Sequence, residues 1–193
     1  MKTIHALLIL IVLLSNCKKD VSSCKDYQQK DVRENLIDPN AIDIPEFKAF
    51  LTQYSYLKPC EFNSDQYSAL MKCYVFYKGI PVLTDQYIFS KNKSTNEVVV
   101  MDTLRSYDLP VSTNPGVSYT DAIEKAKEVM NFDHTCIVYS LGIYDTSLQG
   151  AYHPNNYVLV WKIEGSKGYP LVIVDANTKQ IYRSLDELIN FKI

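Results

Sequence analysis

Residues 157–184 constrain the fold more strongly than any other part of the chain. They hold two apolar runs, 157–163 and 171–174, which are followed by a turn-rich segment and by a third short run from Gln180. Runs rich in Val, Ile and aromatic residues, with Gly, Asn and Asp between them, are typical of antiparallel strands. The sequence therefore predicts antiparallel strands near the C-terminus.

Side chains alternate along the first of these runs. Its odd-numbered residues, from Tyr157 to Ile163, are apolar and share one face, whereas Lys162 and Glu164 fall on the other face. This alternation predicts a sheet with one packed face and one solvated face.

Two helices are predicted ahead of this stretch. Over residues 44–56, Pro45 suits a first helical turn, and the aromatic residues from Phe47 recur at helical spacing. Further on, Ser118 precedes an amphipathic run and is followed three residues later by Asp121, which is a capping-box-like start.

Strand-like runs follow each helix. Between the first group of strand-like runs and the second helix, residues 109–116 contain two prolines and a glycine. Such a segment cannot continue a helix or a central strand. The expected strands cover 69–77, 81–90 and 97–104 after the first helix, and 135–144 after the second.

A helix followed by strands thus occurs twice in the chain. A helix laid across a small antiparallel sheet is a stable two-layer arrangement, so the predicted class is α+β. We expect two small modules, 41–115 and 116–193, each with one helix packed on an antiparallel sheet.

The N-terminus predicts export. Lys2 and an apolar run over 6–14 have the form of a signal-peptide core, and the run is too short to span a bilayer. The next residues, Leu14-Ser15-Asn16-Cys17, resemble a lipobox, the site where bacterial lipoproteins are cleaved and lipidated, although Asn16 departs from the usual Gly or Ala. An ordinary signal peptide, or a short membrane anchor with an incidental cysteine, is the alternative.

The lipobox interpretation implies a signal peptide over 1–16 and acyl chains, such as palmitate, on Cys17. Several acyl chains make a firm membrane anchor. The polar residues 17–40 then form a flexible tether. The expected location is the cell envelope, lipid-anchored at the outer membrane of a Gram-negative bacterium, with the leaflet left open.

Four further cysteines remain, and in an oxidising compartment they allow three complete pairings. Cys60 and Cys73 bracket a short connection and are the preferred pair; Cys24 and Cys136 are left over. No Cys-x-x-Cys and no closely spaced histidines occur, so no metal site is expected.

The C-terminal residues also resemble a known family. LVW at 159–161, followed by PLVIVDANTKQIY at 170–182, is similar to the terminal hairpin of PepSY domains. Upstream, YKGIPV at 77–82 and VSTNPGVS at 111–118 resemble, in order and spacing, the signatures of the FTP module. FTP and PepSY modules together form the propeptide of thermolysin-type zinc peptidases, and the resemblance covers residues 44–188. It implies a PepSY/cystatin-like fold.

The chain departs from this family in several places. Lys72 stands where the family has arginine, Val75 where it has glutamine, and Lys179 where PepSY usually has glycine. Lysine lacks the bidentate fork of arginine, and valine cannot replace the hydrogen bonds of an amide. The His-Glu-x-x-His motif of the peptidase is absent from the sequence.

The resemblance implies a non-enzymatic binding protein that inhibits or chaperones a secreted or envelope metallopeptidase, needs no cofactor, and touches the membrane through its N-terminal lipid. The tail is the expected contact, because in a precursor it leads toward the protease: Asp186, Glu187, Leu188 and Phe191. The alternative is a structural lipoprotein of the envelope that is unrelated to proteolysis. The formal charge of −2 gives no argument for nucleic acid.

Few individual residues are candidates for a catalytic or ligand-binding role. His134 and His153 lie in polar loops without a recognisable nucleophile nearby. Asp175 is expected to hold a turn through backbone N–H groups rather than to bind a ligand. Gly79 and Pro81 are expected to shape the start of a strand.

Overall fold

The structure is a computed structural model that describes residues 24, 27–133, 135–147 and 153–186. Three sets of predicted residues lie outside the described ones. They are the expected signal peptide with its lipidation site at Cys17, the residue His134, and the tail residues Glu187, Leu188 and Phe191. Within them, no helix has the length and apolar character needed to cross a membrane.

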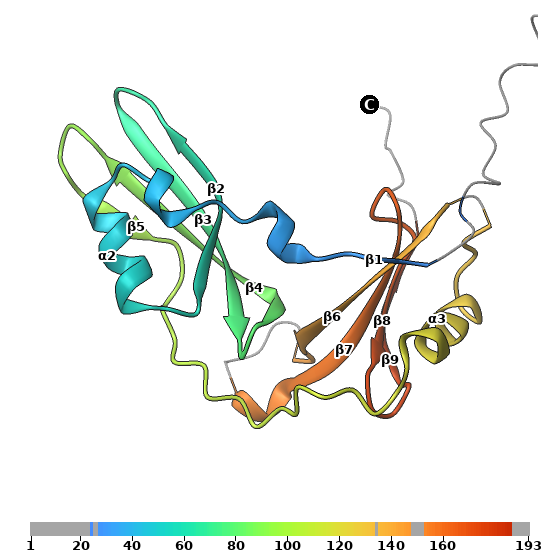
Figure 1. The fold of residues 1–193 in the computed structure, drawn as a ribbon. Helices are drawn as coiled ribbons and strands as arrows, with labels where there is room; N and C mark the ends of the chain where they lie inside the picture. Colours follow the sequence, from blue (N-terminus) through green and yellow to red (C-terminus); the bar gives the residue numbers. More distant parts are fainter. Residues whose placement is uncertain (1–23, 25–26, 134, 148–152, 187–193) are drawn as a thin grey trace, which may run out of the picture.

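One mixed sheet connects the described strands (Figure 1). Its order is β2-β3-β4-β6-β7-β8-β9, with β1 beside β6 and β5 beside β4. Neighbouring strands are antiparallel except at the parallel pairs β1–β6 and β4–β6. The strands are β1 Gln28–Gln29, β2 Leu57–Ser64, β3 Ser68–Tyr77, β4 Ile80–Asn92, β5 Val98–Val100, β6 Ile137–Asp145, β7 Tyr157–Gly165, β8 Leu171–Asp175 and β9 Ile181–Leu185.

The two halves of the sheet meet where β4 pairs with β6 through Val82 and Ile143. Figure 1 shows that the halves diverge from this junction, with helices α2 and α3 on their outer sides. The predicted α+β class is confirmed, and the two expected modules share one sheet. We call the face of the sheet opposite the helices the inner face.

The helices begin where local chemistry favours them. Helix α2, Pro45–Gln53, has Pro45 in its first turn, and helix α3, Tyr119–Lys127, is capped by the Ser118 hydroxyl, which accepts from the Asp121 N–H at 3.1 Å. Both predicted helices are therefore confirmed, with α2 ending three residues earlier than residue 56.

The main core lies between the helices and the sheet. Phe47 of α2 and Ile123 of α3 are fully buried in it, together with the odd-numbered residues of β7 from Tyr157 to Ile163. The predicted alternation is thus confirmed, but the second face is not simply solvated. Tyr144, Val160 and Ile173 form a smaller buried cluster on the inner face.

The strand predictions differ from the structure mainly at the edges. Strand β2 was not predicted, because Pro59 normally ends regular structure; here it lies in an edge strand beside a register shift, where proline is tolerated. The run expected over 97–104 forms only the short β5, since residues 101–118 contain neither helix nor strand.

The connection between β3 and β4 is a tight turn. Lys78 and Gly79 have φ of 49° and 83°, the left-handed values that a two-residue hairpin turn needs. Pro81 follows inside β4, opposite Phe76. Gly79 suits such a position because it lacks a Cβ.

Asp175 holds the turn between β8 and β9. One carboxylate oxygen, Oδ1, accepts the N–H groups of Asn177 at 2.8 Å and Thr178 at 2.7 Å, and Oδ2 accepts the Tyr182 hydroxyl at 2.9 Å. Lys179, at the position where PepSY has glycine, adopts a left-handed φ of 65°. The turn therefore occupies both oxygens of this carboxylate.

We expect protonation of Asp175 to lower the free energy of unfolding at acidic pH. Burial raises the pKa of Asp175, but the Asn177 and Thr178 amides and the Tyr182 hydroxyl outweigh burial and hold that pKa below its ordinary value. A group with a depressed folded pKa stabilises the fold above its unfolded pKa of about 3.9 and loses this contribution as the pH falls.

Denaturant unfolding at pH 7 and at pH 3 would measure this effect. Asp175→Asn should be destabilised at pH 7 and should lose less stability on acidification than the wild type. The control is Asp43→Asn at an exposed position. An unchanged acid dependence in Asp175→Asn would contradict the expectation.

The structure corrects the prediction of a flexible tether over 17–40 for residues 27–40. Strand β1 pairs with Val138 and Tyr139 of β6, and the Lys30 ammonium contacts Glu164 at 2.8 Å. The physical reason is that β4 pairs with β6 only at Ile143, which leaves backbone N–H and C=O groups on the same edge of β6 without a strand partner. The backbone of a polar segment can form hydrogen bonds with these groups. Composition does not reveal this pairing.

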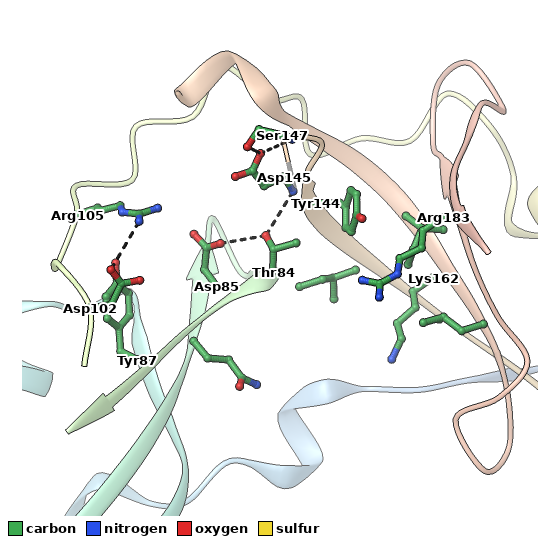
Figure 2. Close-up of a pocket in the computed structure, with 14 residues that line it drawn as sticks. Thr84, Asp85, Tyr87, Asp102, Arg105, Tyr144, Asp145, Ser147, Lys162 and Arg183 are labelled. Atoms are coloured by element: carbon green, nitrogen blue, oxygen red, sulfur yellow. Dashed lines mark hydrogen bonds and ion pairs between the residues drawn. The ribbon is translucent and has the colours of Figure 1, made fainter. Parts of the chain in front are cut away.

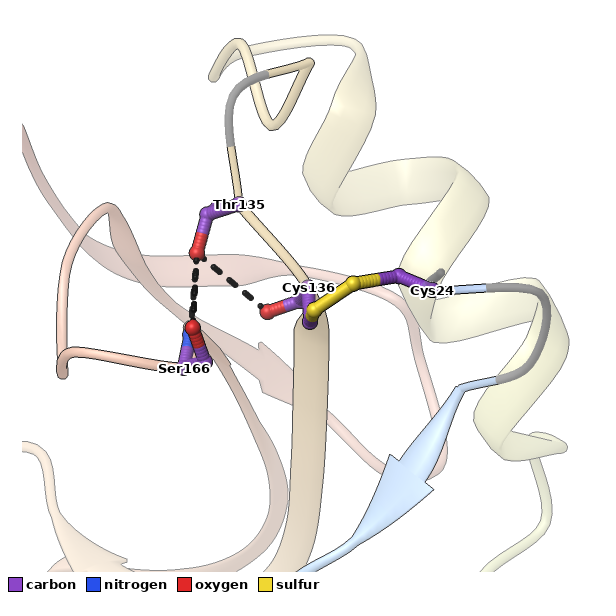
Figure 3. Close-up of a disulfide and its surroundings, with 4 residues drawn as sticks. All are labelled: Cys24, Thr135, Cys136 and Ser166. Atoms are coloured by element: carbon purple, nitrogen blue, oxygen red, sulfur yellow. Dashed lines mark hydrogen bonds between the residues drawn. A yellow bond between two sulfur atoms is a disulfide. The ribbon is translucent and has the colours of Figure 1, made fainter. Parts of the chain in front are cut away.

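The cysteine pairing is also corrected. Cys24 is joined to Cys136, with their Cα atoms 5.4 Å apart (Figure 3). Cys60 and Cys73 are free thiols. The preferred Cys60–Cys73 pair is wrong because Pro59, rather than Cys60, lies opposite Cys73 at the register shift in β2. Cys73 is fully buried, and burial raises its pKa to about 12.

Candidate functional site

A cavity of about 640 Å³ opens where the two halves of the sheet meet, and we call it the junction cleft (Figure 2). Strands β4, β6, β7, β8 and β9 and the segment after β5 contribute to it. Its volume lies within the usual range for ligand sites. The lining residues are 83–87, Asp102, Arg105, Tyr144, Asp145, Ser147, Lys162, Leu171, Ile173 and Arg183.

The carboxylates of the cleft are engaged with their neighbours. Asp85 Oδ2 accepts the hydroxyls of Tyr107 at 2.6 Å and Tyr157 at 2.8 Å. Asp145 Oδ1 accepts both the N–H and the hydroxyl of Ser147, at 2.8 and 2.6 Å. These bonds connect strands β4 and β7 to the loops around the cleft.

The tyrosines beside Asp85 are strong donors. Burial, followed by the bond to Asp85, raises the pKa of Tyr107 and of Tyr157 well above the ordinary tyrosine value. Both hydroxyls therefore stay protonated at any physiological pH and can only donate to this carboxylate.

We expect this cluster to make the protein sensitive to alkali. A folded pKa raised above the unfolded value of about 10 gives stability that is present below pH 10 and is lost as the pH rises above it. Tyr107→Phe should be destabilised by about 1.5 kcal/mol at pH 7, because Asp85 loses a donor, and should lose less stability between pH 9 and 11.

Denaturant unfolding across this pH range tests the expectation. Tyr67→Phe is the matched control, because Tyr67 is 67% exposed. Equal alkaline losses in the wild type and in Tyr107→Phe would contradict it.

The opposite end of the cleft is cationic. Lys162, Ile173 and Arg183 lie side by side in one cross-strand row on β7, β8 and β9. The Lys162 ammonium contacts the buried Glu164 at 2.5 Å, and Lys30 contacts the same carboxylate. Arg183 is exposed and has no ion pair with the part of the chain that the structure describes.

Tyr144 is the unusual residue of this site. It is 3% exposed and its ring stacks on Tyr182 with 6.2 Å between centroids. Its hydroxyl has no hydrogen-bond partner, which is unique among the buried side-chain groups of the described residues. Such an unpaired group costs about 1–3 kcal/mol, so it is normally satisfied or functional.

The residues singled out from the sequence lie away from this cleft. His153 is exposed and caps a short 3₁₀ helix through Nδ1, Lys72 lies in β3 opposite Glu61 and Ile88, and Val75 is buried. Asp186 is exposed just beyond β9. The described residues contain no group of three His, Cys, Asp or Glu side chains that is arranged to hold a metal ion.

The sequence could not reveal the cleft. Tyr144 and Lys162 belong to strands that were predicted, but only the register across β6, β7, β8 and β9 places them with Arg183. Chemically, the β7–β9 end of the site combines the two cations Lys162 and Arg183, an unpaired hydroxyl donor and the apolar side chains of Leu171 and Ile173. This combination suits binding of an amphipathic segment.

Comparison with known proteins adds little. No protein-family model and no curated protein matches the chain. Among solved structures, the C-terminal domain of YpeB from Bacillus megaterium is similar, with a TM-score of 0.37 and 16% sequence identity over 82% of this chain and 70% of that chain. A TM-score this low establishes neither a shared fold nor a shared function.

Proposed function

We propose that this protein is a non-enzymatic binding protein that holds an extended segment of a partner protein in the junction cleft. The observation that carries the proposal is the cleft itself, a cavity of about 640 Å³ built on strands, with charged groups and an apolar floor. Ligands bind in concave sites of this kind, where apolar side chains supply contact area and a few polar groups fix the orientation.

The partner we propose is a secreted or envelope metallopeptidase, which the protein inhibits or helps to fold. Support comes from the order of the propeptide-like segments, 77–82 and 111–118, ahead of the PepSY-like hairpin. The end of β9 at Leu185 leads from the cleft wall at Arg183 into the expected contact tail.

We further propose that lipidated Cys17 anchors the protein at the outer membrane. The disulfide of Cys24 ties the chain to the sheet shortly after this position. A fully extended chain from residue 17 to residue 24 spans at most roughly 25 Å, so the folded part would stay near the membrane surface. Cys17→Ser should abolish incorporation of a labelled fatty acid and release the protein from the membrane fraction.

Site-specific photo-crosslinking tests the proposed binding function. A photoreactive amino acid at Gln86, an exposed residue of the cleft, should cross-link to a metallopeptidase secreted by the same organism. The same amino acid at Lys48, exposed on α2, should not. Activity and refolding assays of the captured peptidase then distinguish an inhibitor from a chaperone.

Two outcomes would contradict the proposal in different ways. No complex, no inhibition and no effect on refolding across the secreted metallopeptidases would rule out the peptidase partner. Cross-linking from Gln86 to an envelope protein without peptidase activity would favour a structural lipoprotein instead.

A further inference from the structure

The β7–β9 end of the junction cleft carries uncompensated positive charge. Lys30 and Lys162 share the single carboxylate of Glu164, at 2.8 and 2.5 Å, and Arg183 has no ion pair with the described residues. At the other end of the cleft, by contrast, Asp85 already accepts two tyrosine hydroxyls. The cationic end therefore favours an anionic ligand group.

The cross-strand row places the two cations on either side of one apolar residue. Lys162 pairs with Ile173, and Ile173 pairs with Arg183, so their side chains emerge on the same face. Figure 2 shows Lys162 and Arg183 together at this end of the cavity, near Tyr144. An anion above Ile173 would lie between an ammonium and a guanidinium, and a guanidinium can bind a carboxylate through two parallel hydrogen bonds.

Tyr144 supplies an independent observation that points to a ligand. Elsewhere in this protein, tyrosine hydroxyls donate to carboxylates: Tyr107 and Tyr157 to Asp85, and Tyr182 to Asp175. The Tyr144 hydroxyl, in the cleft wall, is buried and lacks any such acceptor among the described residues. An incoming carboxylate oxygen would satisfy it.

The apolar floor indicates that the anion belongs to a larger molecule. Leu83, Leu171 and Ile173 line the same cavity, and Ile173 packs with Val160 and Tyr144 in the inner-face cluster. Ile173 is only 3% exposed, but Leu83 and Leu171 are partly exposed. A small anion alone would leave these two side chains uncovered, whereas the residues that flank an acidic side chain in a peptide would cover them.

We propose that the junction cleft recognises an acidic side chain of an extended peptide segment, with Arg183 and Lys162 binding its carboxylate and the Tyr144 hydroxyl donating to it. This inference rests on the proposed binding function and names the chemistry that the cleft selects.

Matched peptide libraries test the proposal on the full chain, purified from a host that exports it. The first library consists of heptapeptides with blocked ends and a fixed central glutamate; the second has glutamine at that position. A third has glutamine and a free C-terminal carboxylate. The glutamate library should bind about tenfold more tightly than the blocked glutamine library in fluorescence anisotropy, as expected for one charge-assisted hydrogen bond.

Variants assign the effect to residues. Arg183→Gln and Tyr144→Phe should each weaken binding of the glutamate library by about tenfold and weaken binding of the glutamine library much less, because a neutral amide oxygen is a weaker acceptor than a carboxylate. Lys48→Gln, on the outer side of α2, should change neither. Because Tyr144→Phe removes an unpaired group, its melting temperature should not fall, which separates a binding role from a packing role.

The outcomes separate this inference from the proposed function. Equal binding of the glutamate and glutamine libraries would overturn the inference while the proposed binding function stands. Preference for the third library, or displacement by acetate alone at equal concentration, would overturn the assignment to an acidic side chain. No binding of any library, together with no cross-link from Gln86, would overturn both.

Discussion

Removing the disulfide between Cys24 and Cys136 is expected to lower the free energy of unfolding by about 4 kcal/mol. The cross-link joins residues that are 112 positions apart, and closing so long a loop removes much conformational freedom from the unfolded chain. The comparison is between the wild type and a double variant, Cys24→Ser with Cys136→Ser, in denaturant unfolding under non-reducing conditions.

The disulfide also has a local effect that can be measured separately. It lies next to β1, whose backbone continues with the Lys30 N–H donating to the Tyr139 carbonyl at 2.8 Å. In the double variant this amide should exchange its hydrogen faster, because the segment is then held to β6 by a short pairing alone.

Cys60→Ser is the control for this pair. Cys60 is a free, half-buried thiol, so its replacement should change stability by less than about 1 kcal/mol. A wild-type protein whose unfolding midpoint does not move on reduction would show that the cross-link contributes nothing to stability.

The second large effect is expected at the turn between β7 and β8. In Gly165→Ala, the new Cβ would overlap the backbone carbonyl oxygen of Tyr169 and approach Thr135 side-chain atoms at 2.8 Å. The turn cannot easily move aside, because the Gly165 N–H donates to the Pro170 carbonyl at 2.9 Å. We expect destabilisation by about 3 kcal/mol or more.

Gly168→Ala in the same turn is the matched control. Gly168 has a φ of +93°, but a Cβ added there would have no atom within 4 Å, so this variant should lose only about 1 kcal/mol through the backbone conformation. Thermal and denaturant unfolding of both variants would measure the difference. Equal losses of stability in the two variants would mean that the atoms around Gly165 move aside and accommodate the new Cβ.

Local chemistry explains what could be predicted correctly. The alternation along β7 and the hydroxyl cap of Ser118 depend on neighbouring residues alone, and both occur in the structure as the sequence indicates. The strands of the C-terminal half were recognised for the same reason.

Long-range pairing explains what could not be predicted. Gln28 and Gln29 look like tether residues, yet they pair with an open edge of β6 more than one hundred positions later. Cys60 and Cys73 are close in sequence, but the register shift in β2 puts Pro59 opposite Cys73. Neither fact is a property of the local sequence.

The sequence by itself determined the α+β class and the positions of its helices and most of its strands, because hydrophobic period and capping are local properties. Only the tertiary structure decided the disulfide, the ordered N-terminal segment and the junction cleft. The cleft exists because the register of four strands brings Tyr144, Lys162 and Arg183 to one face, and register is set by packing across the whole sheet.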